Sequence, residues 1–198
     1  WLEATIPTLG GAEPPLLEDK LDYWRRWQRV LFDAGYAGLS WPKQYGGGGA
    51  DAKIRAVFNE ELDRAGAPER LNIIGEDFGG PTIIQFGTPA QQERYLEAIL
   101  TGDEIWCQLF SEPGAGSDLA SLTTKAVKVD GGWRITGQKI WTSTAHNADW
   151  CFVLVRTNPN AAKRQEGISF LLVDMKTPGI TVRPIINLEM HDEFCEIG

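Results

Sequence analysis

Glycine and small hydroxyl side chains gather in one segment of the chain, residues 111–118, which reads Ser-Glu-Pro-Gly-Ala-Gly-Ser-Asp. The segment begins like the Gly-x-Gly loop that binds dinucleotides, but Leu119 stands where the third glycine belongs and no helical pattern follows. A Rossmann site is therefore excluded. What remains is a turn whose uncovered backbone N–H groups can approach a flat or anionic ligand. The alternative is a corner of a β domain that binds nothing, and this segment alone does not separate the two.

A second segment, residues 137–146, places an indole before small hydroxyl side chains. Trp141 is followed by Thr142 and Ser143 at the end of a predicted strand. An indole can stack on a ring system while neighbouring hydroxyls form hydrogen bonds to the edge of that ring. The same pattern is also typical of an aromatic residue packed in a core, so the segment by itself leaves both interpretations open.

Other chemistries find less support in the sequence. The two histidines, His146 and His191, are isolated from cysteines at the spacing of a metal site. A hydrolase nucleophile is not indicated, because there is no Gly-x-Ser-x-Gly motif and Ser117 is not set between a strand and a helix. Glu112 precedes Pro113 inside the glycine-rich segment, which favours a structural hydrogen bond over a catalytic base. We expect His146 to be a packing or hydrogen-bonding residue.

Composition places these segments in an ordinary globular protein. The 198 residues are 42% hydrophobic and 23% charged, a balance that supports a packed core. A net charge of −8 disfavours nucleic-acid binding, and no apolar run approaches the roughly 18 residues that span a bilayer. We therefore expect a cytoplasmic protein that binds neither nucleic acid nor a membrane. A reducing compartment also suits the three cysteines, which lie outside any Cys-x-x-Cys pair: Cys107, Cys151 and Cys195.

The first half of the chain must supply helices. Apolar periodicity predicts helices over residues 17–34, 51–65 and 72–86, the last interrupted by a Gly-Gly-Pro sequence. The fourth helix has the clearest start signal. Thr88 is followed by a proline and, three residues after the cap, by Gln91, which is the capping-box arrangement, and the helix ends before a glycine.

The second half of the chain has the periodicity of strands. The turn Asp-Gly-Gly predicts a hairpin over residues 125–136. Further β-branched, apolar runs predict strands over residues 150–157, 168–174 and 180–184. The change of period near residues 102–104 predicts two domains, a helical domain over 1–103 and an antiparallel β domain over 104–198.

Taken together, the two polar segments closely resemble the two flavin-contacting signatures of the acyl-CoA dehydrogenase family. Three further stretches resemble the same family in order along the chain: Trp41–Gly47, Gly87–Gln92 and Gly102–Glu104. The resemblance implies an α+β multidomain protein with an N-terminal helical domain, a middle antiparallel β-barrel-like domain and a C-terminal helical bundle. The family holds FAD between the middle and C-terminal domains and across a subunit interface.

The resemblance also implies roles for particular residues. Gln108 stands where many members carry an aromatic residue, so an amide contact is expected there, and Ser143 replaces the commoner threonine while keeping a hydroxyl near flavin N5. The implied cofactor-binding residues are Gln108, Phe110, Ser111, Trp141, Thr142 and Ser143. The implied residues beside the acyl-CoA thioester are Gly116 and Ser117.

The activity that the resemblance implies is FAD-dependent α,β-dehydrogenation of an acyl-CoA thioester. The implied electron acceptor is an electron-transfer flavoprotein, and the implied assembly is a homo-oligomer, either a dimer or a tetramer. The family's catalytic glutamate lies in the C-terminal bundle, so the base is expected beyond Gly198 and residues 1–198 alone are expected to be inactive. Two alternatives remain. One is a non-catalytic partner subunit of a heteromeric enzyme, and the other is a flavin oxidase or monooxygenase on the same fold.

Overall fold

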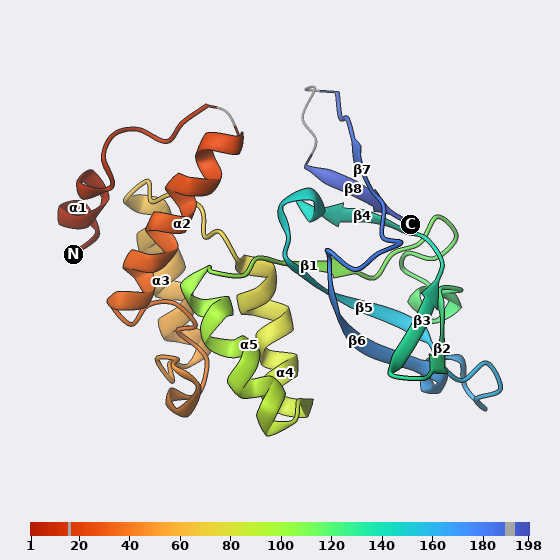
Figure 1. Ribbon diagram of the computed structural model, residues 1–198. Helices are drawn as coiled ribbons and strands as arrows, with labels where there is room; N and C mark the ends of the chain where they lie inside the picture. The colour runs from red at the N-terminus through yellow and green to blue at the C-terminus, as the bar shows by residue number, and fades with distance from the viewer. Residues whose placement is uncertain (16, 189–192) are drawn as a thin grey trace. The chain divides into compact units, whose positions relative to one another are not determined.

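The computed structural model describes residues 1–15, 17–188 and 193–198. The chain forms two compact units, Trp1–Ile105 and Trp106–Gly198. Figure 1 shows that helices make up the first unit and strands the second. A helical domain followed by a β domain was expected from the change of period, and this fold class is confirmed.

Unit 1 contains the predicted helices and several short ones. One difference concerns the predicted helix 72–86, which passes through its Gly-Gly-Pro sequence instead of breaking there. The proline lies in the first turn of α4, and the π-helical turn η3 comes directly before it, where the regular hydrogen-bonding pattern of the helix changes. The elements are α1 (Leu2–Thr5), η1 (Ile6–Leu9), α2 (Leu17–Asp33), η2 (Lys43–Tyr45), α3 (Ala52–Arg64), η3 (Gly75–Gly79), α4 (Gly80–Phe86) and α5 (Pro89–Thr101).

Side-chain caps define two of these helices. Asp51 Oδ1 accepts hydrogen bonds from the backbone N–H groups of Lys53 and Ile54, both at 2.9 Å, and so begins α3. Thr88 and Gln91 form the predicted capping box at the start of α5, with donor–acceptor distances of 3.3 and 2.9 Å. These caps satisfy N–H groups that the helices themselves leave unpaired.

The core of unit 1 lies between α2, α4, α5 and the loop before η2. Trp41 is buried in this core and its ring lies directly on the backbone of Gly80, where a Cβ atom would approach the indole to 2.0 Å. Only glycine permits this contact, so α4 can pack closely on the loop. The largest fully buried apolar side chains of the unit are Trp27, Leu31, Ile99 and Leu100.

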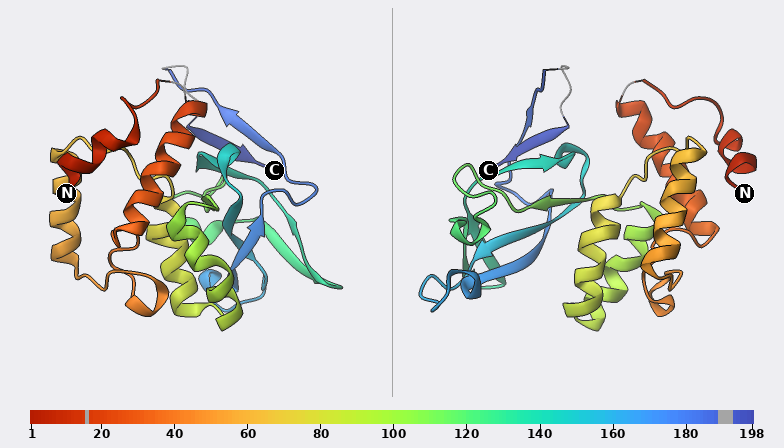
Figure 2. Two further views of the ribbon diagram at one scale, coloured as in Figure 1. Left: turned by 60° about the vertical axis from the view of Figure 1, so that its left-hand side comes forward. Right: turned by 180° about the vertical axis from the view of Figure 1, so that it is seen from behind.

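Unit 2 consists of two sheets (Figures 1 and 2). The larger sheet has the order β1-β5-β2-β3, with β6 also paired to β5, and the smaller has the order β4-β8-β7. Its strands are β1 (Trp106–Leu109), β2 (Lys125–Val129), β3 (Gly132–Thr136), β4 (Lys139–Ser143), β5 (Trp150–Arg156), β6 (Ile168–Asp174), β7 (Val182–Ile185) and β8 (Phe194–Ile197). Three short 3-10 helices connect them: η4 (Leu119–Ser121), η5 (Ala145–Asn147) and η6 (Arg164–Gly167).

The β domain differs from the expectation in two respects. Its sheets are open and do not close into a barrel, and β1 runs parallel to β5, with Trp106 opposite Trp150 and Leu109 opposite Val153. Parallel neighbours need a long connection between them, and here the β2–β3 hairpin and β4 lie in that connection. The remaining neighbours are antiparallel apart from a single parallel pairing of β2 with β5.

No helix among the described residues is long and apolar enough to cross a membrane.

Candidate functional site

The structure brings the two polar segments of the sequence together in unit 2. The backbone N–H of Ile140 donates to the carbonyl oxygen of Ser111 at 2.9 Å. Lys139 Nζ donates to the carbonyl oxygen of Phe110 at 3.0 Å. The loop after β1 and the start of β4 therefore lie side by side, with Phe110 and Ser111 next to Lys139 and Ile140.

A buried ion pair lies where the segments meet. Lys139 Nζ is 2.9 Å from Glu112 Oε1, and the two side chains are only 3% and 4% exposed. Glu112 also accepts hydrogen bonds from the Thr123 N–H, the Thr123 hydroxyl and the Thr124 N–H at 2.7, 2.8 and 2.9 Å. The structural hydrogen-bonding role predicted for Glu112 is confirmed.

The environment shifts the titration of both partners. Burial alone would raise the pKa of Glu112, but hydrogen bonds from Thr124, the Thr123 backbone and Lys139 outweigh it and lower the pKa to about 2. Burial lowers the pKa of Lys139, and the neighbouring Glu112 carboxylate opposes that change. A carboxylate with so low a pKa and so many donors is a poor proton acceptor near neutral pH.

The glycine-rich segment forms a tight turn with an accessible outer side. Glu112 and Ala115 exchange backbone hydrogen bonds of 2.8 and 3.1 Å, and Ala115 is buried, which anchors the turn. Gly114, Gly116 and Ser117 are exposed, and a Cβ atom at either glycine would meet nothing within 4 Å. The outer side of the turn is therefore open to a ligand.

Trp141 projects from an irregular position in β4. The pairing of β4 with β8 shifts register between Lys139 and Thr142, so β4 carries one extra residue there, and Trp141 has a φ of 60°. Such a backbone angle is unusual for a bulky side chain and is found preferentially at functional sites. The indole is 60% exposed and touches Phe194 edge-on at a centroid distance of 6.2 Å. The bulge thus directs a large aromatic surface outward.

The other predicted cofactor residues differ in exposure. Gln108, Phe110, Ser111 and Ser143 are half-buried, and the Phe110 ring contacts Phe152 edge-on at 5.7 Å. Thr142 instead is 1% exposed, and its buried hydroxyl has no hydrogen-bond partner among the described residues. The structure places all six predicted residues on β1, the loop after it, and β4.

The first histidine has the hydrogen-bonding role that was expected. His146 lies on the short helix η5 after β4, and its Nδ1 is 3.2 Å from the Sγ of Cys195 on β8. His191 lies outside the described residues. Within residues 1–15, 17–188 and 193–198, no group of three or more His, Cys, Asp or Glu side chains is arranged to hold a metal ion.

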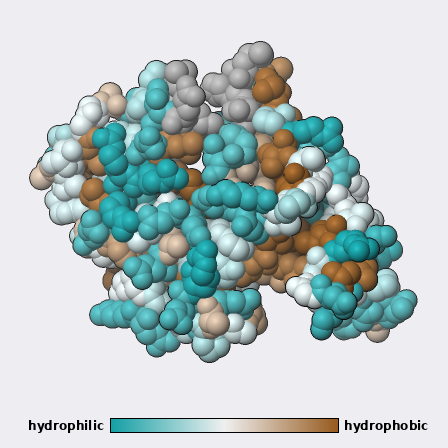
Figure 3. All heavy atoms as spheres, in the orientation of Figure 1, coloured by the Kyte–Doolittle hydropathy of each residue, from teal (hydrophilic) through white to brown (hydrophobic). Residues whose placement is uncertain are grey.

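Both units contain hollows. In unit 2, a hollow of about 680 Å³ has Lys139, Gly137, Trp133 and Ile197 in its walls. Three exposed apolar side chains also lie on the β2–β3 hairpin: Val127, Val129 and Trp133. Figure 3 shows apolar residues among polar ones on the side of unit 2 that faces the viewer. None of the predicted cofactor or thioester residues lines this hollow, which meets the site only at Lys139.

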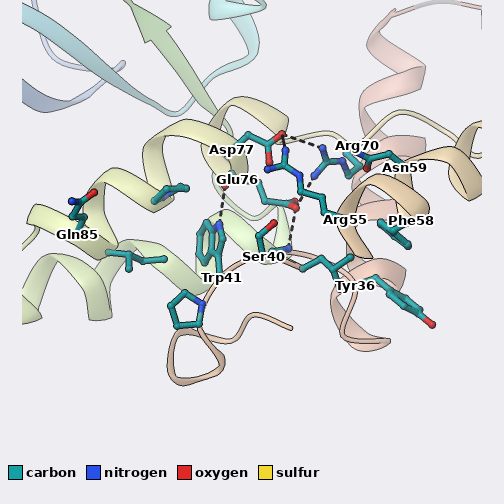
Figure 4. A pocket seen from close by; sticks show the side chains of 15 residues that line it. Tyr36, Ser40, Trp41, Arg55, Phe58, Asn59, Arg70, Glu76, Asp77 and Gln85 are labelled. Atoms are coloured by element: carbon teal, nitrogen blue, oxygen red, sulfur yellow. Dashed lines mark hydrogen bonds and ion pairs between the residues drawn. The ribbon is translucent and has the colours of Figure 1, made fainter. Parts of the chain in front are cut away.

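One of the hollows in unit 1, of about 290 Å³, has charged walls whose groups pair with one another (Figure 4). Arg70 donates to Glu76 at 2.7 Å, and Arg55 lies 2.8 Å from Asp77. Glu76 also accepts from the Gly38 N–H, and its carbonyl oxygen accepts from Trp41 Nε1 at 2.8 Å. These contacts join α3, η3 and the loop before η2, and we assign them a structural role.

Sequence reasoning missed Lys139 as part of the site. No local signal indicated it, because residues two apart in a regular strand share a face, and Lys139 would then lie on the same exposed face as Trp141; the bulge between them breaks this alternation. The partner itself, Glu112, is distant in the sequence, so the pair follows only from the fold.

Comparison with known proteins now defines the class of protein. The family model described as acyl-CoA dehydrogenase, N-terminal domain, matches residues 16–103, and the one described as acyl-CoA dehydrogenase, middle domain, matches residues 107–197. Together these matches cover more than half of the chain. The chain belongs to the acyl-CoA dehydrogenase family, and the resemblance found in its motifs is confirmed.

Individual relatives agree with this assignment. Acyl-CoA dehydrogenase IpdE1 of Mycobacterium tuberculosis is 46% identical over 195 residues, covering 98% of this chain and 50% of the relative. The ChsE4-ChsE5 complex of Mycobacterium tuberculosis has a chain that is 33% identical with a TM-score of 0.82, covering 98% of this chain and 50% of that one. The structure named Tcur3481-Tcur3483 steroid ACAD is also 33% identical, with a TM-score of 0.81 and coverages of 98% and 51%. The chain thus spans about half the length of these relatives.

Proposed function

We propose that the protein is an FAD-dependent acyl-CoA dehydrogenase, which removes a hydrogen from each of the α and β carbons of an acyl-CoA thioester. Residues 1–103 would be its N-terminal helical domain and residues 104–198 its middle β domain. The observation that carries the proposal is the outward-facing indole of Trp141 on the bulged strand β4, next to the segment that contains Ser111.

The residues at this position suit a flavin. An isoalloxazine has a broad aromatic face and a polar pyrimidine edge, and the site offers an exposed indole, the hydroxyls of Ser111 and Ser143, and the amide of Gln108. When bound, the flavin would supply the group that accepts a hydride from the substrate.

The chain's own residues would bind and orient that cofactor. Trp141 would cover part of the ring and exclude water from it. Hydroxyl donors from Ser111 and Ser143 would lie at the polar edge, where they stabilise negative charge on reduction. Phe110 would form part of the apolar wall of the flavin site. Thr142, which is 1% exposed, would pack inside unit 2 and so keep its neighbours in β4, Trp141 and Ser143, at the flavin.

The thioester of the substrate would lie against the open side of the turn that contains Gly116 and Ser117. Gly116 has no side chain and Ser117 a small one, so a ligand can approach the backbone closely at both positions. Glu112 does not serve as the base, because its pKa of about 2 and its four hydrogen-bonding donors suit a permanent carboxylate. We place the proton-abstracting carboxylate outside residues 1–198.

The proposal extends to assembly and partners. We propose that the enzyme acts in the cytoplasm as an oligomer and passes its electrons to an electron-transfer flavoprotein. The full-length protein should purify with the absorption spectrum of an oxidised flavin, and adding an acyl-CoA without oxygen should bleach that spectrum. Absence of flavin, or a flavin that no acyl-CoA bleaches, would overturn the proposal.

A partner subunit of a heteromeric enzyme is the second candidate. Both solved relatives described above are named as pairs of proteins, ChsE4-ChsE5 and Tcur3481-Tcur3483, which favours a site completed by a second polypeptide. Assays of the protein alone and mixed with its candidate partner separate the two proposals. Activity that arises only on mixing supports the heteromer, whereas full activity of the protein alone contradicts it.

A further inference from the structure

The ion pair between Lys139 and Glu112 connects the two segments of the proposed flavin site. One ammonium group donates both to the carboxylate, at 2.9 Å, and to the carbonyl oxygen of Phe110, at 3.0 Å. Lys139 is two residues before Trp141 in the chain, and Phe110 is next to Ser111. A single side chain therefore links the backbone that carries one signature to the backbone that carries the other.

Glu112 fixes this link to a third segment. Its Oε2 accepts from the Thr123 N–H and hydroxyl, and its Oε1 accepts from the Thr124 N–H as well as from Lys139. Gly137 also packs directly on Thr124, since a Cβ atom there would lie 2.7 Å from the Thr124 Cα. The chain entering β4 is thus held against residues 123–124 from two sides.

Stability alone does not explain a buried ion pair. Desolvation of two charges offsets most of their attraction, and an apolar pair of similar volume is often as stable. What an apolar pair cannot provide is directional hydrogen bonding, because only the ammonium can donate to the Phe110 carbonyl and the carboxylate together. The geometry therefore suits a role in orientation.

We propose that Lys139 and Glu112 are positioning residues of the flavin site, which set the loop of Phe110 and Ser111 relative to the bulged strand of Trp141. This inference rests on the proposed function. The carbonyl of Phe110 is held by Lys139 and that of Ser111 by the Ile140 N–H, so two consecutive carbonyl groups are fixed from β4. Neither charged side chain is assigned contact with the reacting atoms.

The test compares the full-length wild-type protein with Lys139→Met and with the double variant Glu112→Gln/Lys139→Met. The single variant leaves a buried carboxylate without its cation, which should lower both thermal stability and FAD affinity. The double variant leaves no unpaired buried charge, so its apoprotein should regain most of the thermal midpoint. Lys176→Met is the matched control, because Lys176 forms an exposed pair with Asp149 in the same unit.

FAD affinity and amide exchange are the deciding measurements. We expect the double variant to bind FAD about tenfold more weakly than wild type, the order expected for one lost charge-assisted hydrogen bond. The Ile140 amide, which donates to Ser111, should exchange faster with solvent in the double-variant apoprotein, while Lys176→Met changes neither quantity. Recovery of wild-type FAD affinity and exchange in the double variant would overturn the positioning role. A wild-type protein that binds no FAD would overturn the proposed function first, and is recognised before any variant is compared.

Discussion

Acid should weaken unit 2 through a single identifiable carboxylate. Glu112 has its pKa lowered to about 2 in the folded protein, against an ordinary value of 4.5. Below pH 4.5 the unfolded chain therefore binds a proton at this position that the folded chain does not. The contribution of Glu112 to stability is fully present above pH 4.5 and is lost as the pH falls from 4.5 towards 2.

The size of this contribution follows from the same two pKa values. Each unit of difference corresponds to about 1.4 kcal/mol, so a change from 4.5 to about 2 corresponds to about 3 kcal/mol. Such an amount is a substantial fraction of the total stability of a domain.

Urea unfolding at a series of pH values between 6 and 2.5 measures the effect. Other carboxylates also titrate there, so the comparison is with Glu112→Gln/Lys139→Met, in which position 112 no longer ionises. The wild-type free energy of unfolding should fall more steeply with acid than that of the variant, with most of the difference of about 3 kcal/mol developed at the lowest pH. Parallel curves for the two proteins would refute the reasoning.

Three further substitutions test separate parts of the structure. Trp141→Ala removes an exposed indole, so FAD should be retained less well in equilibrium dialysis, while the free energy of unfolding changes by less than about 0.5 kcal/mol. Unchanged FAD affinity would contradict the proposal that this indole lies against the flavin ring. Thr88→Ala removes the capping-box hydroxyl and should cost about 1 kcal/mol in urea unfolding, a loss that an unchanged midpoint would contradict. Gly137→Ala places a Cβ atom 2.7 Å from the Thr124 Cα and should lower the free energy of unfolding by about 1 to 3 kcal/mol. Gly114→Ala is the control, because its Cβ atom meets open space. Equal thermal stability of the two variants would contradict the close packing of Gly137 on Thr124.

Features with local causes could be predicted from the sequence. The start of α5 depends on Thr88 and Gln91, which are three residues apart, and its end on Gly102, which adopts a φ of 73° that glycine accommodates easily. The β2–β3 hairpin similarly depends on its own turn residues, with Gly131 at a φ of 79°. In each case the determining residues are neighbours in the chain.

Features that depend on distant partners could not be predicted in this way. The parallel pairing of β1 with β5 joins residues far apart in the sequence, and both strands are short apolar runs that fit either orientation. The bulge at Trp141 arises from the register of β4 against β8, which no pattern within β4 reveals. Glu112 was assigned to structure because of its place before Pro113, but its partner Lys139 follows only from the packing of β4 on the loop after β1.

The central claim of the proposed function is that Trp141, Ser111 and Ser143 surround a flavin. An experimental structure of the full-length protein with FAD tests that claim most directly. We predict that the isoalloxazine lies against the Trp141 indole, with the hydroxyls of Ser111 and Ser143 at its polar edge. A flavin bound elsewhere, with Trp141 still facing solvent, would contradict it.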